Sequence, residues 1–96
     1  MNVVYKYPVK LYEEFTLALN TDSDFLKVDI QDGKPVLWVQ NFNIQNPEKI
    51  KNRRFKCFYT GEPFGDKWNL YIGTFTSYNG YVFHLYEAVE LEHNNL

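Results

Sequence analysis

A cysteine and a histidine, both in predicted strands, are the residues of this chain that could together carry nucleophilic chemistry. Cys57 is the only cysteine, and His84 is one of two histidines. A cysteine nucleophile needs a base within hydrogen-bonding reach and a partly exposed, electropositive setting. Cys57 instead lies between Lys56 and Phe58, where a small core thiol is expected. The sequence contains no nucleophile elbow, glycine-rich phosphate loop or metal-ligand spacing. We therefore expect no enzyme, no bound metal and no cofactor.

A basic segment, Arg53-Arg54-Phe55-Lys56, begins a predicted strand. Because successive side chains of a strand point to opposite faces, Arg54, Lys56 and Thr60 share one face, and Arg53 lies on the other. An arginine and a lysine on one face can bind a phosphate, since the guanidinium presents a fixed fork of donors. The alternative is an edge strand whose cations prevent unwanted pairing.

Aromatic residues are unusually frequent, at 18 of 96, and many lie on both alternating faces of a β-patterned segment. The segments 71–75 and 81–86 are examples. One hydrophobic core can bury only half of such a run. The other half must contact a second sheet, another subunit or a ligand.

We expect the ligand-binding side chains to be aromatic rings, cations and hydrogen-bonding groups. The candidates are Tyr5, Tyr7, Trp38, Arg53, Arg54, Lys56, Thr60, His84 and Tyr86. Tyrosine suits such sites because it combines an apolar ring with a hydroxyl that needs a partner. Two alternatives remain open: Trp38 as a core residue, and His84 as a histidine that hydrogen-bonds a neighbouring strand.

Alternating apolar and polar residues predict seven short strands, at residues 3–7, 14–19, 26–31, 36–42, 53–60, 69–78 and 81–90. In the third strand, Leu26, Val28 and Ile30 are expected to face the core. Asp32-Gly33 is a strong hairpin-turn signal, and Asn79-Gly80 predicts a type I′ turn, which needs positive φ at both residues.

These elements predict an all-β fold, a small antiparallel sandwich or barrel of about seven strands. The polar stretch 43–52 is expected to be a surface loop with room for one short helix. Residues 1–96 form one domain with an ordered core at about 3–90, and the end from His93 to Leu96 is expected to fray.

Charge and hydropathy restrict the classes of partner. The formal net charge of −2 gives no long-range attraction to polyanions, so we expect no polymeric nucleic acid as a partner. No apolar run approaches the roughly 20 residues that cross a bilayer, and the first residues lack the features of a signal peptide. We expect no membrane contact and a location in the cytoplasm.

Six separated blocks of the chain resemble one family. They are Tyr5-Lys6-Tyr7-Pro8, Asp32 to Trp38, Arg53-Arg54-Phe55, Thr60 to Pro63, Tyr71 to Thr74, and Val82 to Glu87. Together they look like the signature of a widespread family of small tailed-phage and prophage proteins, long described only as a domain of unknown function. The resemblance spans about residues 3 to 87. The chain departs from it at Glu62, where many relatives have histidine, and at Tyr5, where many have tryptophan.

The length and style of the chain are also similar to a phage anti-CBASS sponge. That resemblance implies an immune-evasion protein in the host cell cytoplasm. It would assemble as a homo-oligomer, with a tetramer favoured. It would sequester cyclic di- or oligonucleotide signals without cleaving them.

Two other functions fit the residues. One is a phage protein-interaction module that docks on a host protein through exposed aromatics. The other is a small-barrel binder of single-stranded nucleic acid, whose usual basic groove conflicts with the acidic balance of this chain.

Overall fold

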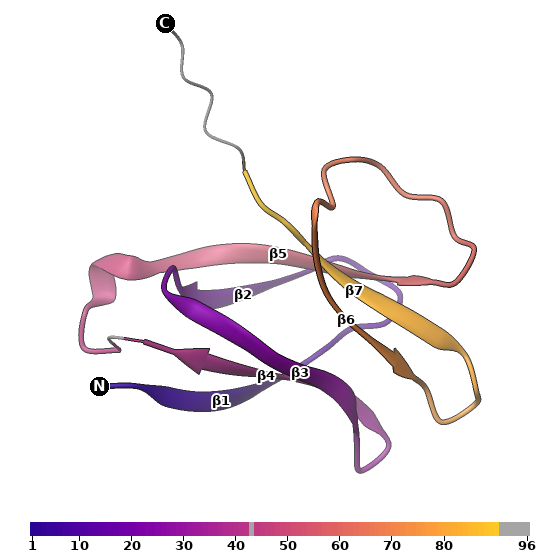
Figure 1. The fold of residues 1–96 in the computed structure, drawn as a ribbon, viewed down its shortest axis with the longest axis horizontal. Helices are drawn as coiled ribbons and strands as arrows, with labels where there is room; N and C mark the ends of the chain where they lie inside the picture. Colours follow the sequence, from indigo (N-terminus) through magenta and orange to yellow (C-terminus); the bar gives the residue numbers. More distant parts are fainter. Residues whose placement is uncertain (43, 91–96) are drawn as a thin grey trace, which may run out of the picture.

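The computed structural model describes residues 1–42 and 44–90, and these residues form seven strands and one 3₁₀ turn (Figure 1). The strands are β1 (Val3–Pro8), β2 (Phe15–Asn20), β3 (Ser23–Gln31), β4 (Lys34–Asn41), β5 (Ile50–Tyr59), β6 (Leu70–Thr76) and β7 (Val82–Ala88). The 3₁₀ turn η1 (Pro47–Lys49) lies in the stretch where a short helix had room to form. The predicted all-β fold is confirmed.

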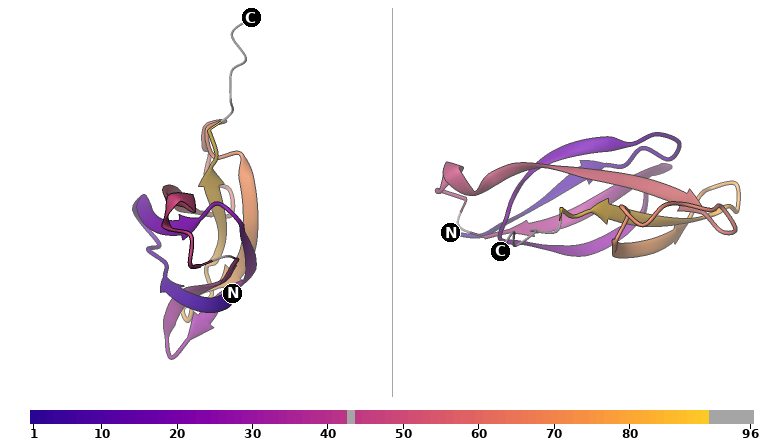
Figure 2. Two further views of the ribbon diagram at one scale, coloured as in Figure 1. Left: turned by 90° about the vertical axis from the view of Figure 1, so that its left-hand side faces the viewer. Right: turned by 90° about the horizontal axis from the view of Figure 1, so that it is seen from above.

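Two antiparallel sheets form a sandwich (Figure 2). The first sheet has the strand order β1-β4-β3, and the second has the order β2-β5-β7-β6. The chain changes sheet after β1, after β2 and after β4, and each sheet contains one tight hairpin, β3–β4 or β6–β7. Strands β5 and β7 are the central strands of the second sheet, so their side chains define both of its faces.

Strict alternation on the central strands builds the core. The fully or almost fully buried core residues of these strands and of β4 are Leu37, Val39, Phe55, Cys57, Phe83 and Leu85. Rings also fill the space between the sheets, because Phe25 of β3 meets Phe55 of β5 edge-on at 5.7 Å. Burying these apolar groups is the main driving force for joining the two sheets.

The two hairpins turn in different ways. At the β3–β4 turn, Asp32 and Gly33 both have positive φ, of 52° and 79°, as a type I′ turn requires. The type I′ prediction for Asn79-Gly80 is wrong, since Gly80 alone has positive φ there. Ser77 N–H donates to the Tyr81 carbonyl and Gly80 N–H donates to the Ser77 carbonyl. This three-residue loop ends in a left-handed glycine, so the backbone needs only one positive φ.

The edges of β3 and β6 approach each other closely and both are irregular. Leu26 interrupts the register of β3 and is half exposed, so its predicted place in the core is wrong. Ile72 interrupts the register of β6 in the same way. A β-bulge adds one residue to a strand and redirects the side chains beside it. Beyond the β6 bulge, a Cβ on Gly73 would lie 2.7 Å from Cγ1 of Val28, so only glycine fits at this contact.

Two expectations concern the ends of the chain and membranes. The expected fraying from His93 to Leu96 falls outside the described residues. Among residues 1–42 and 44–90, the structure has no helix with the length and apolarity to span a membrane.

Candidate ligand-binding face

Five of the nine ligand-binding candidates from the sequence lie on the outward side of the β2-β5-β7-β6 sheet. We call this surface the outer face and define it by Arg54, Lys56, Phe58, Thr60, Tyr71, Thr74, His84 and Tyr86. These residues alternate along β5 and β7 with the buried core residues. The alternation that fills the core on one side therefore fixes the content of the outer face on the other.

Strand register sorts the outer face into rows. Lys56 is opposite Tyr86, and Tyr86 is opposite Tyr71 on the far strand. The next row contains Phe58, His84 and Thr74, which come from β5, β7 and β6. Directly opposed side chains in a sheet are close enough to interact, so each row is a line of contacts across three strands.

A long loop from Gly61 to Asn69 connects β5 with β6 (Figure 1). Its side chains supply further rings to the outer face. Phe64 stacks on Phe58 with ring centroids 4.1 Å apart and an interplanar angle of 19°. Trp68 contacts the same ring edge-on at 5.9 Å. Phe58 is only 2% exposed although it points away from the sandwich core, because the loop covers it.

Three rings on this surface remain available to solvent. Tyr86 contacts Phe64 at 4.9 Å and Tyr71 at 5.5 Å, so the rings form a continuous group. Tyr71 is 53% exposed, Phe64 is 43% exposed and Tyr86 is half-buried. We call these three rings the aromatic shelf. Aromatic faces of this kind stack on the rings of nucleobases and similar ligands.

A chain of hydrogen bonds runs beside the shelf. Tyr71 Oη lies 2.6 Å from Thr74 Oγ1, and Thr74 Oγ1 lies 2.9 Å from His84 Nδ1. On the other side of the imidazole, His84 Nε2 lies 2.8 Å from Thr60 Oγ1. Both ring nitrogens of His84 are thus engaged, and the chain ends at two exposed hydroxyls, Tyr71 and Thr60.

Cations lie at the edge of the aromatic group. The ammonium group of Lys56 is 5.4 Å from the Phe58 ring, and that of Lys67 is 5.1 Å from the Trp68 ring. Arg54 forms an exposed ion pair with Glu14 at 3.6 Å. Beside them is a hollow of about 330 Å³, lined by Arg54, Asp66, Lys67, Asn69, Ala88, Val89 and Glu90. The charge of this area is mixed, so it offers specific cations without a broadly basic surface.

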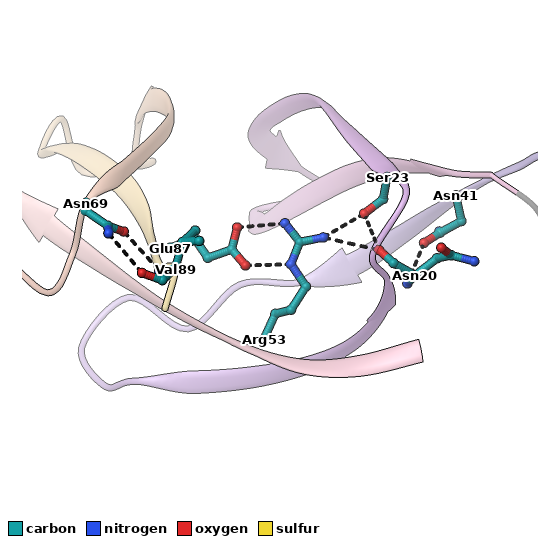
Figure 3. Close-up of polar contacts among 7 residues, drawn as sticks. All are labelled: Asn20, Ser23, Asn41, Arg53, Asn69, Glu87 and Val89. Atoms are coloured by element: carbon teal, nitrogen blue, oxygen red, sulfur yellow. Dashed lines mark hydrogen bonds and ion pairs between the residues drawn. The ribbon is translucent and has the colours of Figure 1, made fainter. Parts of the chain in front are cut away.

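Arg53 lies on the opposite side of the same strand, inside the sandwich (Figure 3). Its guanidinium forms a two-point ion pair with Glu87 of β7, with Nε–Oε2 at 2.5 Å and Nη2–Oε1 at 2.7 Å. The same group donates to the carbonyl oxygen of Asn20 and to the hydroxyl of Ser23. Arg53 therefore links β5 to β7 and to the turn between β2 and β3.

The remaining sequence candidates lie on the other sheet. Tyr7 packs against the core, and its hydroxyl accepts a hydrogen bond from Asn41 at 3.3 Å. Tyr5 is about half exposed and meets the Tyr7 ring edge-on. Trp38 is partly exposed and points away from the core, since its neighbours on β4 are completely buried. The structure thus groups Arg54, Lys56, Thr60, His84 and Tyr86, and it places Tyr5, Tyr7, Trp38 and Arg53 elsewhere.

The one cysteine of the chain does not belong to the outer face. Cys57 points into the core, and burial raises the pKa of its thiol from 9.0 to about 12. A thiol that stays protonated is a poor nucleophile. Among the residues that the structure describes, no group of three or more His, Cys, Asp and Glu side chains is arranged to hold a metal ion.

Several residues of the outer face were not among the sequence candidates. Phe58 shares the parity of Lys56 along β5, so alternation alone could have found it. Tyr71 and Thr74 have opposite parity along β6, and only the bulge at Ile72 places both on this face, so alternation alone could not have found the pair. Phe64 and Trp68 lie in an irregular loop. Their positions depend on how that loop folds back, which no periodic pattern indicates.

The fold and this surface define a small all-β sandwich whose second sheet has a polar and aromatic outer face. A family model matches residues 1–95 of the chain, and its description is a domain of unknown function (DUF7352). The protein belongs to this family. Searches of curated proteins and of solved structures found no match.

Proposed function

We propose that this protein is a non-catalytic binding protein that captures a cyclic nucleotide signal on its outer face. The observation that carries the proposal is the junction of the aromatic shelf with the hydrogen-bond chain through His84. Stacking rings and adjacent hydroxyl, imidazole and ammonium groups are the combination that a nucleotide needs. The engaged imidazole and the buried thiol suit binding without turnover.

The resemblance to phage proteins supplies the proposed biological setting. In it, the protein is made in an infected cell and removes cyclic di- or oligonucleotide messengers of CBASS-type defence from the host cytoplasm. A chain of 96 residues has little surface with which to enclose such a ligand alone. A homo-oligomer, with a tetramer favoured, would bury the shelf and the ligand between subunits.

Calorimetric titration with a panel of cyclic di- and trinucleotides tests the proposal. We expect saturable binding and recovery of the ligand unchanged by mass spectrometry after release. Light scattering on the same samples measures the subunit number with and without ligand. Recovery of a hydrolysed ligand would contradict the proposal and indicate an enzyme.

Matched substitutions then locate the site. Tyr86→Ala removes the central ring of the shelf and should weaken binding by about 1–3 kcal/mol, the value of one base stacked on one ring. Lys56→Ala should weaken it about tenfold, because an ammonium group near the phosphates is lost. Lys34→Ala, on the other sheet, is the matched control and should bind as the wild type does. Equal affinities for all three variants would remove the outer face from the proposal.

A second candidate is a protein-interaction module. Tyr78 and Tyr81 flank the β6–β7 turn and are 86% and 61% exposed, which is unusual for rings that serve only the fold. Tyrosines of this kind are frequent in protein interfaces. A stable monomer that binds no cyclic nucleotide, and loses capture of a purified host protein after Tyr78→Ala, would favour this function.

A further inference from the structure

The hydrogen-bond chain across the outer face has a direction. A neutral imidazole carries a single N–H, so one ring nitrogen donates and the other accepts. His84 has a hydroxyl at 2.9 Å from Nδ1 and another at 2.8 Å from Nε2. The tautomer of His84 therefore sets the orientation of every hydroxyl in the chain, from Tyr71 at one end to Thr60 at the other.

Two orderings of the protons satisfy these contacts when Thr74 donates once and accepts once. If Nε2 carries the proton, it donates to Thr60, while Tyr71 donates to Thr74 and Thr74 donates to Nδ1. If Nδ1 carries the proton, each of these donations is reversed. In the first ordering, the free hydroxyl proton at the surface belongs to Thr60, and Tyr71 offers only lone pairs. In the second, the two ends exchange these roles.

The tyrosine favours the first ordering. A phenol is more acidic than an aliphatic hydroxyl, so it is the better donor of the pair. The contact of 2.6 Å between Tyr71 Oη and Thr74 Oγ1 lies at the short end of the range for O–H···O bonds. A phenol that donates inward leaves the Thr74 proton to His84 Nδ1, and the Nε2 proton to Thr60.

We propose that this ordering makes the outer face selective for a nucleotide whose base carries an amino group. The proposal rests on the function proposed above. Tyr71 presents acceptor lone pairs beside the aromatic shelf, where a stacked base would lie, so it accepts from an amino group on that base. Thr60 presents a donor to an acceptor oxygen of the ligand, such as a phosphate oxygen.

The length of the hydrogen-bond chain also affects the size of the ligand. Thr60 and Tyr71 are separated by an imidazole ring, a threonine hydroxyl and three hydrogen bonds. A ligand that contacts both ends must extend past the imidazole and the threonine, so we expect a ligand of nucleotide size or larger to bind more tightly than a free base.

The first experiment measures the tautomer of His84 without any ligand. Two-dimensional ¹H–¹⁵N spectra of the imidazole distinguish Nε2–H from Nδ1–H by the shifts of the two nitrogens. We expect the Nε2–H form in the wild type and an increased Nδ1–H fraction in Tyr71→Phe, which lacks the inward donor. Tyr78→Phe removes a hydroxyl from an exposed tyrosine that is not part of the hydrogen-bond chain, so it should leave the tautomer of His84 unchanged. A wild type in the Nδ1–H form would overturn the ordering.

The second experiment compares ligands that differ in the amino group. The probes are cyclic di-AMP, its analogue built from purine riboside, which lacks the amino group, and free adenine. We expect cyclic di-AMP to bind about threefold to tenfold more tightly than the purine analogue, the value of one hydrogen bond. Free adenine should bind more weakly than either. Tyr71→Phe should abolish the difference between the two dinucleotides, and Tyr78→Phe should retain it.

The outcomes separate this inference from the proposed function. Equal affinity of the wild type for the two dinucleotides would overturn the selectivity while leaving nucleotide binding in place. Absence of binding to every cyclic nucleotide would overturn the proposed function, and the selectivity with it. The spectra of the ligand-free protein would then still decide in which direction the protons are donated along the hydrogen-bond chain.

Discussion

Strands β5 and β7 carry two polar networks, one inside the sandwich and one on the outer face. In the interior, Arg53 and Glu87 form a two-point ion pair, and Glu87 is only 3% exposed. The guanidinium also donates hydrogen bonds to Asn20 and Ser23. The described residues contain no buried side-chain nitrogen or oxygen without a hydrogen-bond partner. On the outer face, the hydrogen-bond chain through His84 ends at the exposed residues Thr60 and Tyr71.

The difference separates stability from binding. A buried charge has lost its hydration, so it must be paired within the protein and its partners have no capacity for a ligand. A network that ends at the surface keeps donors and acceptors for which only water competes. Adjacent residues can thus differ completely in role, as Arg53 and Arg54 do.

The largest expected effect breaks the interior network. Glu87→Ala leaves the largely buried Arg53 guanidinium without its carboxylate partner, and we expect the free energy of unfolding to fall by about 3–5 kcal/mol. Urea denaturation followed by fluorescence measures the change. Arg54→Ala, whose ion pair is exposed, is the matched control and should cost no more than about 1 kcal/mol. Similar losses in the two variants would refute the distinction between the networks.

The next effect tests the contact that joins the edges of the two sheets. Gly73→Ala places a methyl group against Val28, and we expect a loss of about 1–3 kcal/mol from overpacking. In a Val28→Ala background the obstructing methyl is gone, so the same change should cost less. An unchanged cost in that background would mean that the glycine is needed for a reason other than this contact.

A smaller effect separates binding from stability on the outer face. Phe64→Ala removes the ring that covers Phe58, and we expect a loss of about 1–2 kcal/mol in stability from the lost stacking and burial. Nucleotide affinity should fall further, because the aromatic shelf loses one of its three rings. Calorimetry beside urea denaturation measures both. A loss of stability without any loss of affinity would exclude the shelf as the binding surface.

The smallest effect concerns the buried thiol. Its pKa of about 12 keeps Cys57 protonated, so the folded protein should react very slowly with iodoacetamide at pH 8, and rapidly in urea. The sign for stability follows. The thiol of the unfolded protein ionises at a lower pH than the buried thiol. The contribution of the buried thiol to the free energy of unfolding is therefore full below pH 9 and is lost as the pH rises towards 12. Cys57→Ala should lack this part of the decline, and equal alkali sensitivity of the two proteins would contradict it.

Sequence patterns could predict the strands because alternation is a local property of the chain. They placed Arg54, Lys56 and Thr60 on one face, since parity along a strand determines the face. They could not place His84 beside these residues, because that depends on the pairing of β5 with β7. They could not predict that Arg53 meets Glu87, because that contact depends on which strands are neighbours. The bulge at Leu26 was also missed, because it interrupts the alternation of β3 where this strand pairs with β4.

The loop from Gly61 to Asn69 packs its rings on Phe58 of the outer face, and none of its residues belongs to the hydrophobic core between the sheets. Insertions, deletions and substitutions within this segment can therefore reshape the outer face while the sandwich beneath keeps its register. Members of one family can thus present different surfaces on this sheet by varying nine residues.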